Sequence, residues 1–145
     1  MKRVICFALC ILSGTLLFGC TKTTEPEPER PRISVFVVNE ANEADVWILP
    51  DTEANRKTTL WGTATVAKLN VNDKQPASVE ESESGAYLFR MIDTDLKFYS
   101  VSGIKLKADY MLTLRPTGAF YDFELLIFDE NGNLIGTYEV FAAKL

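Results

Sequence analysis

A chain of 145 residues, 47% of them hydrophobic and 11% aromatic, has the length and composition of one globular domain. Beyond position 19 it carries 13 basic and 20 acidic side chains, a net charge of −7. Nucleic-acid binding is excluded on this ground, because it requires Lys and Arg to neutralise phosphates. Histidine is absent, which excludes histidine-dependent catalysis and histidine metal sites. All three cysteines lie in the first 20 residues, so the folded part has none.

The first 19 residues have the order of a secretion signal. Met1-Lys2-Arg3 is positively charged, Val4 to Leu12 is almost entirely apolar, and small residues follow before Cys20. The apolar stretch of about 15 residues is shorter than the roughly 20 that a transmembrane helix needs. We therefore expect a signal peptide over residues 1–19.

The end of this signal resembles the lipobox of bacterial lipoproteins. Leu17-Phe18-Gly19-Cys20 has the leucine, the small residue and the cysteine in the family's order, although Phe18 is larger than usual. The resemblance implies cleavage before Cys20 and a diacylglyceryl group on its sulfur; the alternative is an ordinary signal peptide with a chance cysteine. Two or three acyl chains hold a protein at a bilayer essentially permanently.

The expected location follows from the same resemblance. Thr21, rather than Asp, follows Cys20, which implies outer-membrane delivery in a host with two membranes and the outer face of the cell membrane otherwise. Residues 20–31 then form a tether, in which alternating Pro and Glu favour extended polyproline geometry. At about 3.1 Å per residue, this tether could hold a domain roughly 30 Å from the membrane.

The folded part, residues 32–145, begins with short apolar runs between polar segments. Strands are predicted over 33–38 and 46–49, and a polar loop over 51–58. Residues 60–69 fit either a strand or a helical turn. Residues 70–85 are predicted to form a solvated loop or a weak edge strand.

The second half has a stronger strand pattern. Residues 87–92 and 96–101 flank a predicted hairpin turn, and residues 104–115 alternate apolar and polar side chains over twelve positions. Such a period of two predicts one half-buried strand. Residues 121–127 and 134–141 form a further pair, joined through Asn131-Gly132, a strong hairpin signal.

Seven or eight short strands without a long helix predict an all-β fold. The expected architecture is an antiparallel β-sandwich, immunoglobulin-like or transthyretin-like, with a closed barrel as the alternative. Val38-Asn39, Val46 to Pro50, Trp61-Gly62, Phe120 to Phe123 and Asp129 to Gly132 resemble the motifs of small secreted or lipid-anchored bacterial β-sandwich modules. That resemblance implies the same fold and no activity. Glu-Ala stands where those modules usually have Thr-Gly, and residues 70–103 include extra positions.

Two carboxylate pairs, Asp93 with Asp95 and Asp129 with Glu130, have the residue types of glycosidase acid–base pairs. Both lie in predicted turns, where such residues are favoured for backbone reasons. The segment 129–133 also fails the EF-hand calcium spacing, because its glycine is at position four instead of six. We therefore expect no enzyme activity, no metal site and no cofactor.

Two other features are candidates for binding. Trp47 and Trp61 could stack on sugar rings, although a tryptophan among apolar neighbours is more often part of a core. The acidic run Glu80 to Glu83 could dock a basic partner or is a solubilising face. The expected function is a non-catalytic, membrane-anchored protein-binding or structural module. The alternatives are a cell-surface carbohydrate-binding module and an envelope inhibitor of a hydrolase such as lysozyme.

Overall fold

The structure is a computed structural model that describes residues 29–118 and 122–143. The predicted signal peptide, Cys20 and most of the tether lie outside these residues. The described chain contains nine strands and one short helix, in the order β1 (Arg32–Asn39), β2 (Ala44–Pro50), α1 (Glu53–Lys57), β3 (Val66–Leu69), β4 (Lys74–Glu80), β5 (Ala86–Asp93), β6 (Phe98–Lys105), β7 (Met111–Pro116), β8 (Phe123–Phe128) and β9 (Leu134–Val140).

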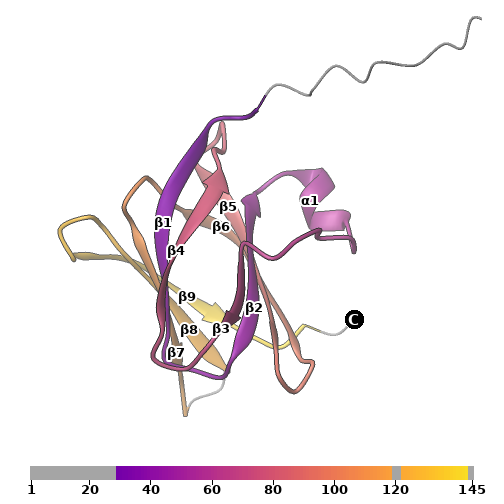
Figure 1. The fold of residues 1–145 in the computed structure, drawn as a ribbon, viewed down its shortest axis with the longest axis vertical. Coiled ribbons are helices and arrows are strands. Elements are labelled where there is room, and N and C mark those ends of the chain that lie inside the picture. The colour runs from indigo at the N-terminus through magenta and orange to yellow at the C-terminus, as the bar shows by residue number, and fades with distance from the viewer. Residues whose placement is uncertain (1–28, 119–121, 144–145) are drawn as a thin grey trace, which may run out of the picture.

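These strands form two sheets, which confirms the predicted β-sandwich (Figure 1). One sheet has the order β4-β1-β7-β8-β9, and the other has the order β3-β2-β5-β6. Every described strand pair is antiparallel except β1 with β7, which run parallel. Two sheets with separate edges replace the closed barrel that the sequence left open.

The core lies between the inner faces of the two sheets and follows from the alternation of the strands. Side chains that are completely or almost completely buried come from both sheets and include Val35, Val37, Phe89, Met91, Leu112, Leu114, Leu125 and Ile127. Burying such side chains stabilises the fold by about 1.5–3 kcal/mol each. No disulfide is needed for a core of this extent.

The predicted continuous strand over 104–115 is wrong. It is divided between the end of β6 and the whole of β7, which belong to different sheets. The chain turns at Asp109, whose φ is 64° and whose N–H donates to the carbonyl of Ser34. Ile104 and Leu112 both point into the common core, so the period of two continues across the turn.

Strand pairing decides the structure of residues 60–69 and 70–85, for which the sequence left alternatives. Only residues 66–69 of the predicted segment 60–69 form a strand, β3, and residues 60–65 are irregular. Within 70–85, β4 pairs with β1 from Arg32↔Glu80 to Val38↔Lys74, so the edge-strand alternative is correct. The predicted loop over 51–58 contains α1. No helix of the described ranges is long and apolar enough to cross a bilayer.

The hairpin turn after β5 is built around one buried carboxylate. Asp93 is buried and accepts hydrogen bonds from the N–H groups of Asp95 and Lys97 and from the Tyr99 hydroxyl. Tyr99 is itself buried at the centre of the sandwich and packs edge-on against Phe123. Burial, and next the bond to Asp93, raise the pKa of Tyr99 above its usual value of 10.0.

Replacing Tyr99 by Phe should therefore remove a pH dependence. Because the pKa of Tyr99 is higher in the folded state than in the unfolded state, stability is unaffected below about pH 10 and falls as pH rises further. The variant should be less stable by about 1–3 kcal/mol at neutral pH, since Asp93 loses a buried donor, and its alkaline decline should be shallower. Urea unfolding at several pH values measures both effects. Tyr110→Phe, which alters a half-buried tyrosine, should keep the wild-type slope.

Candidate functional site

The segment between β2 and β3, residues 51–65, folds back over the outer face of the four-stranded sheet. It contains α1 and lies to one side of the sandwich in Figure 1. Outward-facing side chains of the sheet are consequently buried: Trp47, Leu88 and Arg90 are between 2% and 9% exposed. We call residues 51–65 the covering loop. It turns an outer sheet face, which would otherwise meet water, into a second small core.

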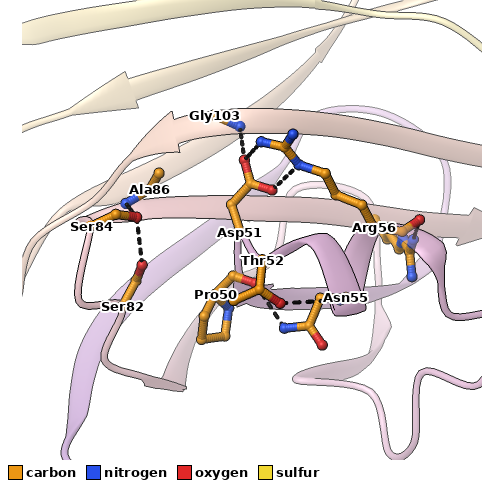
Figure 2. A network of polar contacts seen from close by, with 10 residues as sticks. Pro50, Asp51, Thr52, Asn55, Arg56, Ser82, Ser84, Ala86 and Gly103 are labelled. Atoms are coloured by element: carbon orange, nitrogen blue, oxygen red, sulfur yellow. Dashed lines mark hydrogen bonds and ion pairs between the residues drawn. The ribbon is translucent and has the colours of Figure 1, made fainter.

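One end of the covering loop is tied down by Asp51. Figure 2 shows its carboxylate between the Arg56 guanidinium and the main-chain N–H of Gly103 in β6. The Asp51 side chain is only 1% exposed, whereas Arg56 remains largely in solvent. Hydrogen bonds from Arg56, and then from Gly103, hold the pKa of Asp51 below its usual value. The first turn of α1 is also capped by Thr52, which accepts from the N–H of Asn55.

The middle of the covering loop is held by Arg90. This side chain leaves β5 on the outer face and donates to the main-chain carbonyls of Arg56 and Thr58, at 3.0 and 3.1 Å. Its guanidinium also lies 4.8 Å from the centre of the Trp61 ring, a cation–π contact. Burial lowers the pKa of Arg90. The buried Nε has no hydrogen-bond partner among the described residues, so the stabilisation comes from the two carbonyls and the ring.

Trp61 lies at the centre of an aromatic cluster. Its ring packs edge-on against Trp47, with centroids 5.1 Å apart, and lies 4.6 Å from Phe98 in a tilted arrangement. Trp47, Phe98 and Arg90 all belong to the sheet, so they hold the indole from the sheet side. Trp61 is half-buried. Next to it, Leu60 is 86% exposed.

The polar atoms of this cluster are already used inside the protein. Trp47 Nε1 donates to the carbonyl of Gly62, and Trp61 Nε1 donates to the carbonyl of Thr58. The surface formed by Leu60, Trp61 and Phe98 is therefore apolar in its chemistry. We call these three residues the apolar patch.

On its other side the covering loop borders a groove of about 1540 Å³ at the end of the sandwich where β1 begins. Its walls are polar and apolar in about equal parts, and their polar residues include Thr52, Thr65, Ser78, Glu80 and Ser84. The turn from β4 to β5 forms part of this wall, and Ser82 and Ser84 lie within hydrogen-bond distance there (Figure 2). The hydroxyl and carboxylate groups of such walls offer hydrogen bonds to a ligand.

The carboxylates considered from sequence serve turns, as expected. Asp93 organises the β5–β6 turn, and Asp129 accepts from the N–H groups of Asn131 and Asn133 and from the Asn133 side-chain amide. These bonds, led by the Asn133 amide, lower the pKa of Asp129. The described residues contain no group of three side chains arranged to hold a metal ion.

The other sequence candidates have different places. The acidic run ends β4 and enters a short turn, where Glu81 and Glu83 are exposed and Ser82 N–H donates to the Tyr87 hydroxyl. This turn does not form a long protruding loop. Trp47 and Trp61 are brought together, but Trp47 is 9% exposed and covered by Trp61. Cys20 lies outside the described residues.

Sequence reasoning missed Leu60, Phe98 and Arg90 as members of this site. One signal was present for Arg90, because a lone arginine inside the apolar run of β5 has to find acceptors if the strand is buried. No local pattern pointed to the exposure of Leu60, which precedes Trp61 in the chain, or to Phe98, which meets Trp61 only after the loop folds over the sheet.

No protein-family model, curated protein or solved structure matches this chain significantly.

Asp51→Asn should loosen the covering loop, because the neutral amide cannot form the charged pair with Arg56. We expect trypsin to cleave after Arg56 or Lys57 about tenfold faster, in line with a loss of roughly 1–2 kcal/mol in local stability. Glu53→Gln is the matched control, since it removes only the exposed pair with Lys57. In the native protein the stabilisation should be complete above the usual Asp pKa and be lost as pH falls through the lower folded-state value. Equal cleavage of both variants would contradict this role.

Proposed function

We propose that this protein is a non-catalytic lipoprotein of the bacterial cell envelope, anchored through Cys20, that binds a protein partner with its apolar patch. The anchor is supported by the sequence Leu17-Phe18-Gly19-Cys20 and by the Pro- and Glu-rich residues that follow. The fold is compatible with this arrangement, because the first described strand begins at Arg32, directly after the tether.

The observation that carries the binding proposal is the exposure of Leu60 on a loop that is held firmly in place. Asp51 and Arg90 fix the covering loop at two points, yet Leu60 projects into solvent beside Trp61. A rigid apolar surface loses little conformational entropy on binding, which increases affinity. Tryptophan is also among the residues that contribute most to protein interfaces.

A protein partner fits this surface better than a sugar does. Carbohydrate sites combine an aromatic ring with polar groups that hydrogen-bond hydroxyls. Here both indole N–H groups and the Arg90 terminal nitrogens already donate to main-chain carbonyls. The apolar side chain of Leu60 offers a sugar no hydrogen bond.

Carbohydrate binding remains the second candidate because Trp61 is only half-buried. A sugar ring could stack on its exposed part, and the groove that borders the same covering loop has hydroxyl and carboxylate groups in its walls. Trp47 does not take part in this alternative, since Trp61 covers it.

The anchoring proposal predicts the behaviour of Cys20→Ala. Without the sulfur that carries the lipid, the folded domain should leave the membrane fraction, whereas the native chain should stay with it after washing in high salt. Fractionation and blotting measure this, and protease treatment of intact cells then tells which side of the envelope the domain faces. A Cys20→Ala chain that remains in the membrane fraction as firmly as the native one would disprove lipid anchoring.

The binding proposal predicts a photo-crosslink from the apolar patch in living cells. A benzoylphenylalanine at position 60 should yield a discrete adduct that protease digests, and adding Trp61→Ala should reduce its yield at least about tenfold. The same probe at Lys107, an exposed position on another turn, is the control and should give no such adduct.

The sugar alternative is tested on the same chain. Purified envelope polysaccharide would retard the native protein in affinity electrophoresis but leave Trp61→Ala unaffected. That result, with no protein adduct at position 60, would replace a protein partner by a glycan. Absence of both effects would reject the apolar patch as a binding surface.

A further inference from the structure

Each sheet of the sandwich has two edge strands, and an exposed edge presents main-chain N–H and C=O groups to which another strand can bind. The edges are β4 and β9 in one sheet and β3 and β6 in the other. Natural proteins block such edges with proline, charged side chains, irregular backbone or covering segments. Three of these four edges are blocked, each by a different device.

The edge of β4 is blocked by proline and by an arginine. Phe36 N–H donates to the carbonyl of Tyr110, so the main-chain groups of Phe36 point toward β7 and those of its two neighbours in β1 point toward β4. In the register of β1 with β4, the main-chain groups of Pro76 and Ser78 then point away from β1, toward the open side of the sheet. Pro76 has no N–H to offer. The outward carbonyl of Ser78 accepts from the Arg32 guanidinium at 2.6 Å.

In the other sheet, β3 is four residues long, and Lys68 within it has a φ of 51°, so its backbone cannot template a regular strand. The edge of β6 is covered at both ends. Ala143 N–H donates to the carbonyl of Phe98, and Asp51 accepts from the N–H of Gly103.

The edge of β9 has no proline, and no segment among the described residues covers it; its register with β8 shifts only at its start, and Glu139 is its one charged side chain. The carbonyl of Val140 faces β8, where it accepts from Asp122 N–H, so alternation directs the main-chain groups of Thr137 and Glu139 outward. Within the described ranges, no residue hydrogen-bonds to these outward groups. Leu134 and Ile135, at the start of the strand, are 54% and 49% exposed. The β8–β9 hairpin also projects away from the covering loop in Figure 1.

The charge at the edge of β9 limits which kind of strand can bind there. Glu139 lies directly opposite Glu124 in the register of β8 and β9, and Glu124 in turn lies opposite Arg115 of β7. A lysine or arginine on an added strand would give Glu139 an oppositely charged neighbour on its outer side, and such cross-strand pairs are favourable. A second copy of β9 would instead bring a second Glu139 and no basic side chain to the same edge.

We propose that β9 is a docking edge that accepts an extended, basic strand of a partner protein through main-chain hydrogen bonds at Thr137 and Glu139. The added strand extends the sheet β4-β1-β7-β8-β9 by one position. Its basic side chains face Glu139 on the outer surface, and its apolar side chains continue the inner face beside Tyr138. This inference concerns a second surface and does not depend on Leu60, Trp61 or the lipid anchor.

The probe is an eight-residue peptide with blocked ends in which lysine alternates with valine, mixed with the full chain in non-ionic detergent. Hydrogen–deuterium exchange should slow about tenfold or more over residues 135–140 and stay unchanged in β4. The same peptide with glutamate in place of lysine should protect far less. A fully N-methylated lysine–valine peptide, which keeps the charge but cannot donate from its backbone, should not protect at all.

Two matched variants test the edge itself. Thr137→Pro removes an outward N–H without touching the bonds to β8 and should abolish protection, whereas Ser78→Pro makes the same change on β4 and should not. If Thr137→Pro does not fold, Glu139→Lys decides, because it should reverse the preference from the lysine peptide to the glutamate peptide.

Equal protection by the lysine and glutamate peptides, or protection by the N-methylated one, would overturn the proposal. Protection of residues 135–140 that rises with protein concentration in the absence of peptide would assign the edge to a second copy of the chain instead. These outcomes leave the result of the crosslinking experiment at position 60 unaffected.

Discussion

A guanidinium removed from water needs hydrogen-bond acceptors and a polarisable neighbour at the same place. Arg90 carries such a guanidinium, in the middle of the apolar run of β5. The covering loop supplies two main-chain carbonyls as acceptors and the ring of Trp61 as the polarisable neighbour. The loop thereby also covers Trp47 and Leu88. The aromatic cluster and the exposed position of Leu60 both depend on this one arrangement.

The two sheets use their remaining surfaces differently. The four-stranded sheet gains a second layer on its outer face and has both edges obstructed, by the irregular β3 and by the segments beside β6. The five-stranded sheet has one blocked edge at β4 and one open edge at β9. The apolar patch and the open edge therefore belong to different sheets and offer different chemistry: side-chain packing at one, main-chain hydrogen bonding at the other.

Strand prediction succeeded where the pattern is local and failed where two sheets share one core. The Asn131-Gly132 turn was predicted correctly because its signal lies in adjacent residues, and Gly132 adopts the positive φ that the turn requires. Residues 104–115 were predicted as one strand because the apolar residues of β6 and β7 face the same interior. An alternation of period two shows toward which face of a sheet a side chain points, but it does not show to which of two sheets the strand belongs.

By itself, the sequence determined the all-β fold class, the placement of Asp93 and Asp129 in turns, and the expectation of a lipid anchor at Cys20. Each of these depends on residues that are neighbours in the chain. Tertiary structure alone decided the strand order, the parallel pairing of β1 with β7, and the meeting of Trp61 with Phe98. It also decided which sheet edge stays open. These features join residues far apart in the chain, and their contacts arise only when the sheets pack and bury their shared apolar surface.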